Sequence, residues 1–325
     1  NLARVDYDGT ASSLLVEPQR TNLVTYSEDF SQYNLSGFVA PIESGYLAPD
    51  GTNSAYKVTG VIGSSSIYLP SVSSMTATKS IYARTVSGTG TTRLLSYYGN
   101  TNNTFTLTEE WQRFELTGSI VTGGNNFYAV DFRSLTTTLS ELIIWGGQAE
   151  EASYATSYIP TSGSSVTRVQ ETYSKTGITN LINSEEGVLF LEMAALSNSG
   201  NYRLITLSDG TTSNRVFIGF RLDTGYIYYF VIVGGSTVAS HITSTTSLDF
   251  SKVAVKWKAN DFALWINGSE ISTDTSGSSF TANTLNTLQM NEGDGSGFEF
   301  HGKVKQLQVF KTALTDTELA TLTTI

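Results

Sequence analysis

Apolar and polar residues alternate with a period of two through both halves of the chain, and turn clusters such as 87–90 and 123–126 separate the alternating segments. This pattern predicts strands at 55–58, 66–69, 80–84, 93–98, 111–116, 127–133, 141–145, 187–193, 203–207, 215–220, 225–232, 252–258, 261–268 and 303–310. A long series of short strands is typical of antiparallel sandwiches and jelly rolls. The fold class expected is therefore all-β.

One helix is expected, close to the end of the chain. Thr315 is followed three residues later by Glu318, which is the spacing of a capping box. Apolar residues follow at Leu319 and Leu322. The pattern predicts one short helix after the last strand.

The chain has 325 residues, which suggests two domains at roughly 100–200 residues each. The stretch 158–168 lies near the middle and holds the last of five prolines. We expect two tandem antiparallel sandwiches, with an N-terminal arm or neck at 1–13, a first jelly roll at 14–161, a short junction at 162–168 and a second sandwich at 169–325.

Charge and composition exclude several classes of partner. The net charge is −10, of which −6 falls in residues 1–165 and −4 in 166–325, so neither half offers a basic surface for nucleic acid or anionic membranes. No apolar run approaches the roughly 20 residues of a membrane helix. The absence of cysteine excludes disulfides and thiolate chemistry. Because the sequence begins with Asn1, we interpret it as a fragment of a longer protein.

Five stretches carry a resemblance to known families. Residues 15–30 (LVEPQRTNLVTYSEDF) and 154–168 (YATSYIPTSGSSVTR) resemble a region of bacteriophage tail-fibre, head-fibre and other receptor-binding proteins. The body between them, with 110–116 (EWQRFEL), is similar to jelly-roll carbohydrate-binding modules. Residues 256–268 (KWKANDFALWING) and 302–322 (GKVKQLQVFKTALTDTELATL) resemble concanavalin A-like, laminin G-type lectin domains.

The resemblance implies a virion-surface protein that adheres to cell-surface or environmental polysaccharide without hydrolysing it. It also implies a homo-oligomer, such as a fibre trimer, in which multivalency strengthens weak single sites. Three alternatives stay open: a structural virion decoration without a glycan site, a polysaccharide depolymerase, and a secreted bacterial lectin or adhesin.

Candidate glycan residues follow from strand alternation, because sugar sites combine aromatic faces with Asn, Asp and Arg side chains. In the first domain, Tyr128, Val130 and Phe132 share a face, which leaves Asp131 and Arg133 on the other. The surface residues predicted there are Arg84, Tyr97, Asp131, Arg133 and Trp145. The alternative is that they are ordinary outward polar residues and that Trp145 is core.

In the second domain, alternation predicts a core position for Trp257 and an outward stacking role for Trp265 beside Asn267. The alternative for Trp265 is packing against the first domain or another subunit. Tyr226 and Tyr228 share a face of their strand and are further candidates, although aromatic residues lie on both faces of that strand.

Metal and catalytic candidates are sparse. The laminin G resemblance implies Ca²⁺ at a loop edge, for which Asp209, Asn291, Glu292 and Asp294 are candidates, and plain turns are the alternative. Two distant histidines make no zinc pattern. Neither the dense Asp/Glu strand motif of lectin-like glycosidases nor a G-x-S-x-G elbow is present, so no enzyme activity and no other cofactor is expected.

Overall fold

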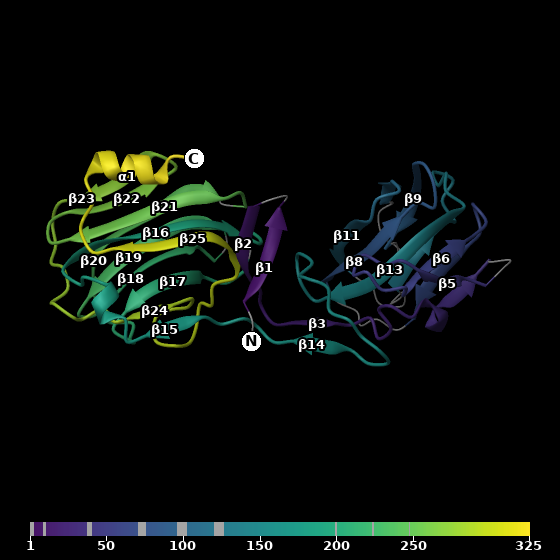
Figure 1. The fold of residues 1–325 in the computed structure, drawn as a ribbon, viewed down its shortest axis with the longest axis horizontal. Helices are drawn as coiled ribbons and strands as arrows, with labels where there is room; N and C mark the ends of the chain where they lie inside the picture. Colours follow the sequence, from purple (N-terminus) through teal and green to yellow (C-terminus); the bar gives the residue numbers. More distant parts are fainter. Residues whose placement is uncertain are drawn as a thin grey trace. The chain divides into compact units, whose positions relative to one another are not determined.

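The computed structural model describes residues 3–8, 11–37, 41–70, 76–95, 103–119, 127–198, 200–222, 224–246 and 248–325 (Figure 1). The chain forms two compact units. The N-terminal unit comprises Gln19–Val169, and the C-terminal unit comprises Gln170–Ile325 together with Asn1–Pro18.

The N-terminal unit is a sandwich of two five-stranded antiparallel sheets. One sheet has the order β10-β9-β12-β7-β4, namely Thr104–Leu107, Gly90–Leu94, Phe127–Asp131, Ser66–Leu69 and Asn34–Ser36. The other has the order β11-β8-β13-β6-β5, namely Gln112–Ser119, Thr76–Arg84, Glu141–Glu150, Ala55–Thr59 and Glu43–Tyr46. A 3-10 turn, Phe30–Gln32, and a separate strand pair, β3 (Arg20–Asn22) with β14 (Val166–Arg168), complete it.

Alternation builds the core between these sheets. In β8, Ala77, Ile81 and Ala83 face the other sheet and are fully buried, whereas Tyr82 and Arg84 lie on the opposite face. β7, β12 and β13 also contribute buried residues, so an apolar cluster joins the two layers.

The C-terminal unit is a larger sandwich. Its seven-stranded sheet has the order β1-β2-β25-β16-β21-β22-β23, namely Arg4–Asp8, Ala11–Val16, Gly302–Phe310, Glu186–Ala195, Ser251–Lys258, Phe262–Ile266 and Ser269–Asp274. Its six-stranded sheet has the order β15-β24-β17-β18-β19-β20, namely Ser174–Thr176, Thr287–Gln289, Arg203–Ser208, Arg215–Phe220, Tyr226–Val233 and Ser236–Thr246. A 3-10 turn lies at Thr179–Leu181, and the helix α1 lies at Asp316–Thr323.

The predicted fold class and the predicted helix are confirmed. Strands at Ser66–Leu69 and Arg215–Phe220 have the predicted bounds, and most other predicted strands differ from the observed ones by a few residues at their ends. Trp257 is fully buried between the sheets, as alternation predicts. No helix of the described residues has the length and apolar character required to cross a membrane.

The expectation of an arm at 1–13 is wrong for the described residues, because Arg4–Asp8 form β1 and Ala11–Val16 form β2. Residues of β2 pair with β25, at Leu14 opposite Val304, and β1 pairs with β2 at the sheet edge. Burial of Val16 in the core explains this placement, because the apolar end of 11–16 completes the seven-stranded sheet. The expected junction 162–168 also differs: Ser162 forms a β-bridge with Tyr26, and β14 pairs with β3, so these residues belong to the N-terminal unit.

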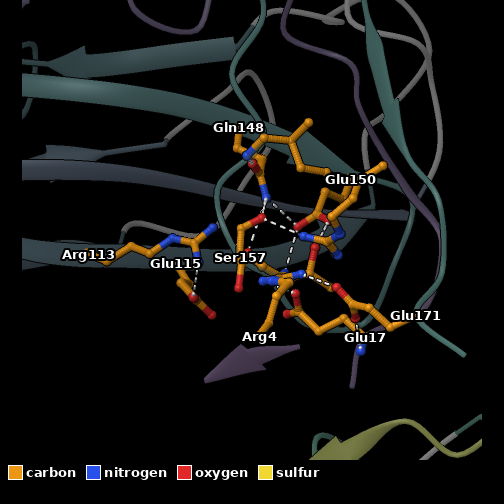
Figure 2. A network of polar contacts seen from close by, with 11 residues as sticks. Arg4, Glu17, Arg113, Glu115, Gln148, Glu150, Ser157 and Glu171 are labelled. Carbon is orange, nitrogen blue, oxygen red and sulfur yellow. Dashed lines mark hydrogen bonds and ion pairs between the residues drawn. The ribbon is translucent and has the colours of Figure 1, made fainter. Parts of the chain in front are cut away.

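An ion-pair cluster holds the first residues in place within the C-terminal unit. Arg4 lies 2.7 Å from Glu17 through Nη2 and 2.7 Å from Glu171 through Nη1 (Figure 2). The Glu17 backbone N–H donates to Glu171 Oε2 at 2.5 Å, and the Glu171 N–H donates to the Glu17 carbonyl at 3.1 Å. These bonds tie together the two places where the chain passes between the units.

The capping box of α1 is present: Thr315 accepts from the Glu318 N–H, and Glu318 Oε2 accepts from the Thr315 N–H at 2.8 Å. Replacing Thr315 by alanine should cost about 1 kcal/mol, because the cap is lost. In calorimetry this would lower the melting temperature of the C-terminal unit by about 2–4 °C. Thr317→Ala, in the exposed first turn, is the matched control and should leave that temperature nearly unchanged. An equal drop in both variants would contradict a capping role.

Candidate functional site

A hollow opens on the outer face of the six-stranded sheet, within the C-terminal unit. In β18 and β19, Ile218 and Tyr229 point into the core, whereas Phe217, Tyr228 and Phe230 lie on the opposite face. These three rings, with neighbouring side chains, line a cavity of about 250 Å³. We call it the sheet-face hollow.

The rings of the hollow form a contiguous cluster. Phe217 stacks on Phe230 with centroids 5.5 Å apart and an interplanar angle of 16°. Tyr228 meets Phe217 edge-on at 5.4 Å, and Tyr202 lies 5.7 Å from Tyr228. Tyr202 also contacts Phe298 at 5.1 Å. Offset and edge-on contacts are the arrangements that aromatic quadrupoles favour, so the rings stabilise one another.

A loop of residues 290–298, which we call the wall loop, forms one side of the hollow. Thr206 and Ser208, on β17, donate hydrogen bonds of 2.6 Å each to the carbonyls of Asn291 and Gly293. Arg215 Nη1 donates to the Glu292 carbonyl at 2.6 Å and lies 3.3 Å from its carboxylate. The sheet therefore fixes the wall loop by side-chain bonds.

The ion pair of Arg215 and Glu292 supplies charged groups at the rim of the hollow. The Arg215 guanidinium also lies 5.1 Å from the centroid of the Phe217 ring, in cation–π geometry. Arg221 and Thr237 add further polar side chains to the lining. Burial raises the pKa of the Tyr228 hydroxyl well above its ordinary value.

Gly219 leaves room for the floor of the hollow. A Cβ atom at this position would lie 2.4 Å from the Arg203 carbonyl oxygen, 2.5 Å from a Leu204 methyl carbon and 3.2 Å from the Tyr228 ring. Glycine thus allows Leu204 and Tyr228 to approach each other across β18.

Of the sequence candidates in this unit, Tyr228 lines the hollow and Tyr226 is not among its lining residues. Trp265 is on the other sheet, 7% exposed, and packs beneath α1 with Phe190 and Leu319. The outward direction of Trp265 was predicted, but the helix covers it, so it offers no free stacking face. Asn267 has a φ of 50° in a turn, where its Oδ1 accepts from the Lys252 N–H.

The N-terminal candidates do not form one site. Trp145 is 4% exposed; it contacts Tyr158 at 4.6 Å and donates to Ser54 Oγ at 2.8 Å, and so belongs to a buried cluster. Arg84 lies 5.4 Å from the Trp111 ring at the edge of the same cluster. Tyr97 lies outside the described residues.

Asp131 ends β12, in the other sheet of that unit, and Arg133 follows it in a turn. Two bonds, of 2.7 Å and 2.9 Å, join their side chains, and the Arg133 guanidinium lies 4.7 Å from the Tyr128 ring centroid. A β-bulge between Tyr128 and Val130 shifts the register, which brings Tyr128 against Arg133 although simple alternation predicts opposite faces.

The calcium candidates have partners within the protein. Asp209 accepts from Thr211 and Asn214, Asn291 from the Gly293 N–H, and Asp294 from Ser296. Glu292 pairs with Arg215. Within the described part of the chain, no group of three or more His, Cys, Asp or Glu residues could hold a metal ion. In this structure Asp209, Asn291 and Asp294 accept hydrogen bonds within turns, and Glu292 lies at the rim of the hollow.

Sequence reasoning did not identify Tyr202, Arg215, Phe217, Phe230 or Phe298 as site residues. A signal was present for three of them. Arg215 and Phe217 lie two residues apart on one predicted strand and therefore on the same face. Tyr228 and Phe230 do so on the next strand, and a short turn joins the two strands. The contribution of the wall loop requires the fold.

Residues 190–320 match the model of the concanavalin A-like lectin/glucanases superfamily, laminin G type. The C-terminal half therefore has a concanavalin A-like, laminin G-type fold. That superfamily takes its name from both binding proteins and enzymes, so the match leaves the activity open. A search of curated protein sequences found no significant match.

The solved structures that match the chain have low sequence identity to it and low TM-scores. The CBM40 module of the Ruminococcus gnavus IT-sialidase, bound to α2,3-sialyllactose, shares 18% identity over 47% of this chain and 98% of that chain, with a TM-score of 0.39. A SAP-like pentraxin from Limulus polyphemus shares 18% identity over 43% of this chain and 70% of that chain, with a TM-score of 0.34. A leech intramolecular trans-sialidase shares 18% over 44% of this chain and 24% of its own, with a TM-score of 0.38.

Proposed function

We propose that the chain is a non-catalytic glycan-binding protein and that the sheet-face hollow holds one sugar residue of a polysaccharide. The observation that carries the proposal is the open cluster of Phe217, Tyr228 and Phe230 beside the fixed Arg215–Glu292 pair. Sugar C–H groups carry a slight positive charge and stack on the negative faces of aromatic rings. Charged side chains at the rim then bond hydroxyl groups and fix the orientation of the sugar.

The same residues argue against hydrolysis. Glycosidases place two carboxylates on either side of the scissile bond. Among the described residues that line the hollow, Glu292 is the acidic one, and its carboxylate is paired with Arg215. The hollow therefore lacks the second carboxylate that a depolymerase would need there.

We also propose the biological setting. The motifs at 15–30 and 154–168 favour a fragment of a phage fibre or receptor-binding protein, exposed on the virion surface and acting as a homo-oligomer. Shallow sugar sites bind weakly, and several tethered copies would raise the effective concentration. A secreted bacterial lectin would use the same hollow, and the neighbouring genes would distinguish the two settings.

Replacing Phe230 by alanine should weaken glycan binding at least about tenfold, which corresponds to roughly 1.4 kcal/mol. Phe230 is only partly buried, so the variant should still fold. The measurement is a glycan array on the intact chain, followed by calorimetric titration with each ligand found. Tyr7→Ala is the control, because Tyr7 is a 72% exposed aromatic residue of the same unit outside the hollow.

The outcomes separate the proposal from its rivals. Binding that Phe230→Ala abolishes and Tyr7→Ala preserves would support the sheet-face hollow. An array with no ligand for the intact chain would contradict glycan binding and favour a structural role. Release of reducing ends from a bound polysaccharide would contradict the non-catalytic assignment.

A further inference from the structure

The lining of the sheet-face hollow is more apolar than the recognition of a fully hydroxylated sugar requires. Leu204, Phe217 and Tyr228 are 1%, 4% and 5% exposed, and they form its floor. Phe230, Ile232 and Ile242 extend the apolar surface toward the edge of the sheet. Polar side chains are confined to a few positions at the rim.

The rim groups are also committed to one another. Arg215 Nη1 donates to the Glu292 carbonyl and lies 3.3 Å from the Glu292 carboxylate, so the two side chains already use part of their hydrogen-bonding capacity on each other. Their remaining donors and acceptors face a ligand from the rim. A sugar hydroxyl placed against Leu204 or Phe217 would lose its water partners and gain none. A methyl group in the same place would leave water without losing a hydrogen bond.

The size of the hollow limits what can enter. Its volume of about 250 Å³ lies just below the roughly 300 Å³ at which small-ligand pockets commonly begin. It suits a single sugar residue with one substituent and not a buried oligosaccharide. The rest of a polysaccharide would extend along the surface.

Resting on the glycan-binding function proposed above, we infer that the hollow selects a sugar residue that carries a methyl group, as in a 6-deoxyhexose or an N-acetylated hexosamine. The methyl group contacts the floor formed by Leu204, Phe217 and Tyr228. The sugar ring stacks on Phe230, and Arg215 and Glu292 bond the ring hydroxyls at the rim.

Matched sugar pairs test this inference. L-fucose and L-galactose differ only at C6, where a methyl group replaces a hydroxymethyl group, and L-rhamnose and L-mannose differ in the same way. N-acetylglucosamine and glucose form the third pair. Calorimetric titration of the intact chain with the free sugars should show, in at least one pair, about tenfold tighter binding of the methyl-bearing sugar.

A variant tests whether the preference arises in the hollow. Ile232 packs against the cluster of Leu204, Phe217 and Tyr228, so Ile232→Thr places a hydroxyl beside the floor and should reduce the ratio of affinities within the pair. Tyr7→Ala should leave the ratio unchanged. A preference in the fucose or rhamnose pair would identify the ligand as a 6-deoxy sugar, and a preference in the N-acetylglucosamine pair would identify it as an N-acetylated one.

Equal affinities within all three pairs, together with glycan binding that Phe230→Ala abolishes, would overturn the methyl selectivity and leave the glycan-binding function standing. Absence of binding to every sugar and to the array would overturn both. A preference that Ile232→Thr does not change would place the selectivity outside the hollow and would also overturn the inference.

Discussion

Replacing Arg4 by alanine is expected to destabilise the C-terminal unit by about 3 kcal/mol, because two buried carboxylates then lose their cation. The side chains of Glu17 and Glu171 are 4% and 9% exposed, and Arg4 bonds one with each terminal nitrogen. In calorimetry the melting temperature of this unit should fall by about 6–12 °C. Figure 2 shows how Arg4 lies between the two carboxylates.

Two further variants test the cause of that loss. Asp6 lies on the same strand and pairs with Lys303, but both side chains are 35% exposed, so Asp6→Asn should cost less than about 1 kcal/mol. Adding Glu171→Gln to Arg4→Ala should recover part of the stability, because it removes one uncompensated charge. If the double variant is no more stable than Arg4→Ala, the charge explanation is wrong.

This cluster also illustrates what the sequence can and cannot show. Arg4, Glu17 and Glu171 are up to 167 residues apart, and no local pattern connects them. The pairing of β2 with β25 joins segments about 290 residues apart, so the sequence could suggest a strand at 11–16 but not its sheet. Composition instead favoured a polar arm.

Short apolar runs rich in β-branched and aromatic residues were predictable as strands. Arg215–Phe220 is such a run, buried from Val216 onward, and its bounds agree with the prediction. Ser236–Thr246 was missed because serine and threonine fill most of its positions, so its pattern resembles a loop. The hydrogen bonds of its neighbour, β19, place it in the sheet.

The candidate site was only partly predictable for related reasons. Alternation assigned Trp265 to the correct face of its strand, but the periodicity of a strand carries no information about the helix that covers that face. Conversely, the sheet-face hollow requires aligned registers of β17, β18 and β19, and a loop from about 60 residues further on. Tyr228 was found because aromatic residues on both faces of one strand are visible locally.

The second large expected effect concerns Lys79, which lies inside the N-terminal sandwich. It shares the inward face of β8 with Ala77 and Ile81 and is 2% exposed. Burial lowers the pKa of its ammonium group from 10.5 to about 8. Its Nζ donates to the Leu95 carbonyl at 2.9 Å, and Leu95 has a φ of 58°, which non-glycine residues seldom adopt.

The lowered pKa fixes the direction of the pH dependence. Below about pH 8 the amine is charged in both the folded and the unfolded chain, and the full burial cost of roughly 3 kcal/mol is present. Between pH 8 and 10.5 the folded chain releases the proton while the unfolded chain keeps it, so the free energy of unfolding rises with pH. Lys79 therefore makes the N-terminal unit more stable in mild alkali than at neutral pH.

Lys79→Met should remove this dependence. At pH 7 the variant should be about 1–2 kcal/mol more stable than the natural protein, because the relief of the burial cost exceeds the loss of the Leu95 bond. At pH 10 the natural protein has lost most of that cost, so the difference should vanish or reverse. Calorimetry of both proteins at pH 7 and pH 10 gives the two differences in melting temperature.

Lys57→Met is the matched control, since Lys57 is the other lysine of this unit and lies at the surface. A hydrogen bond with Glu141 raises the pKa of Lys57, so this variant should gain no stability at pH 7. A Lys79→Met protein that is less stable at pH 7 by as much as at pH 10 would show that the pKa of Lys79 is not lowered and would contradict the burial cost. A gain at pH 7 that disappears by pH 10 would show that Lys79 lowers the stability of the N-terminal unit at neutral pH. The role of Lys79 would then be to hold the backbone of Leu95 in its positive-φ conformation.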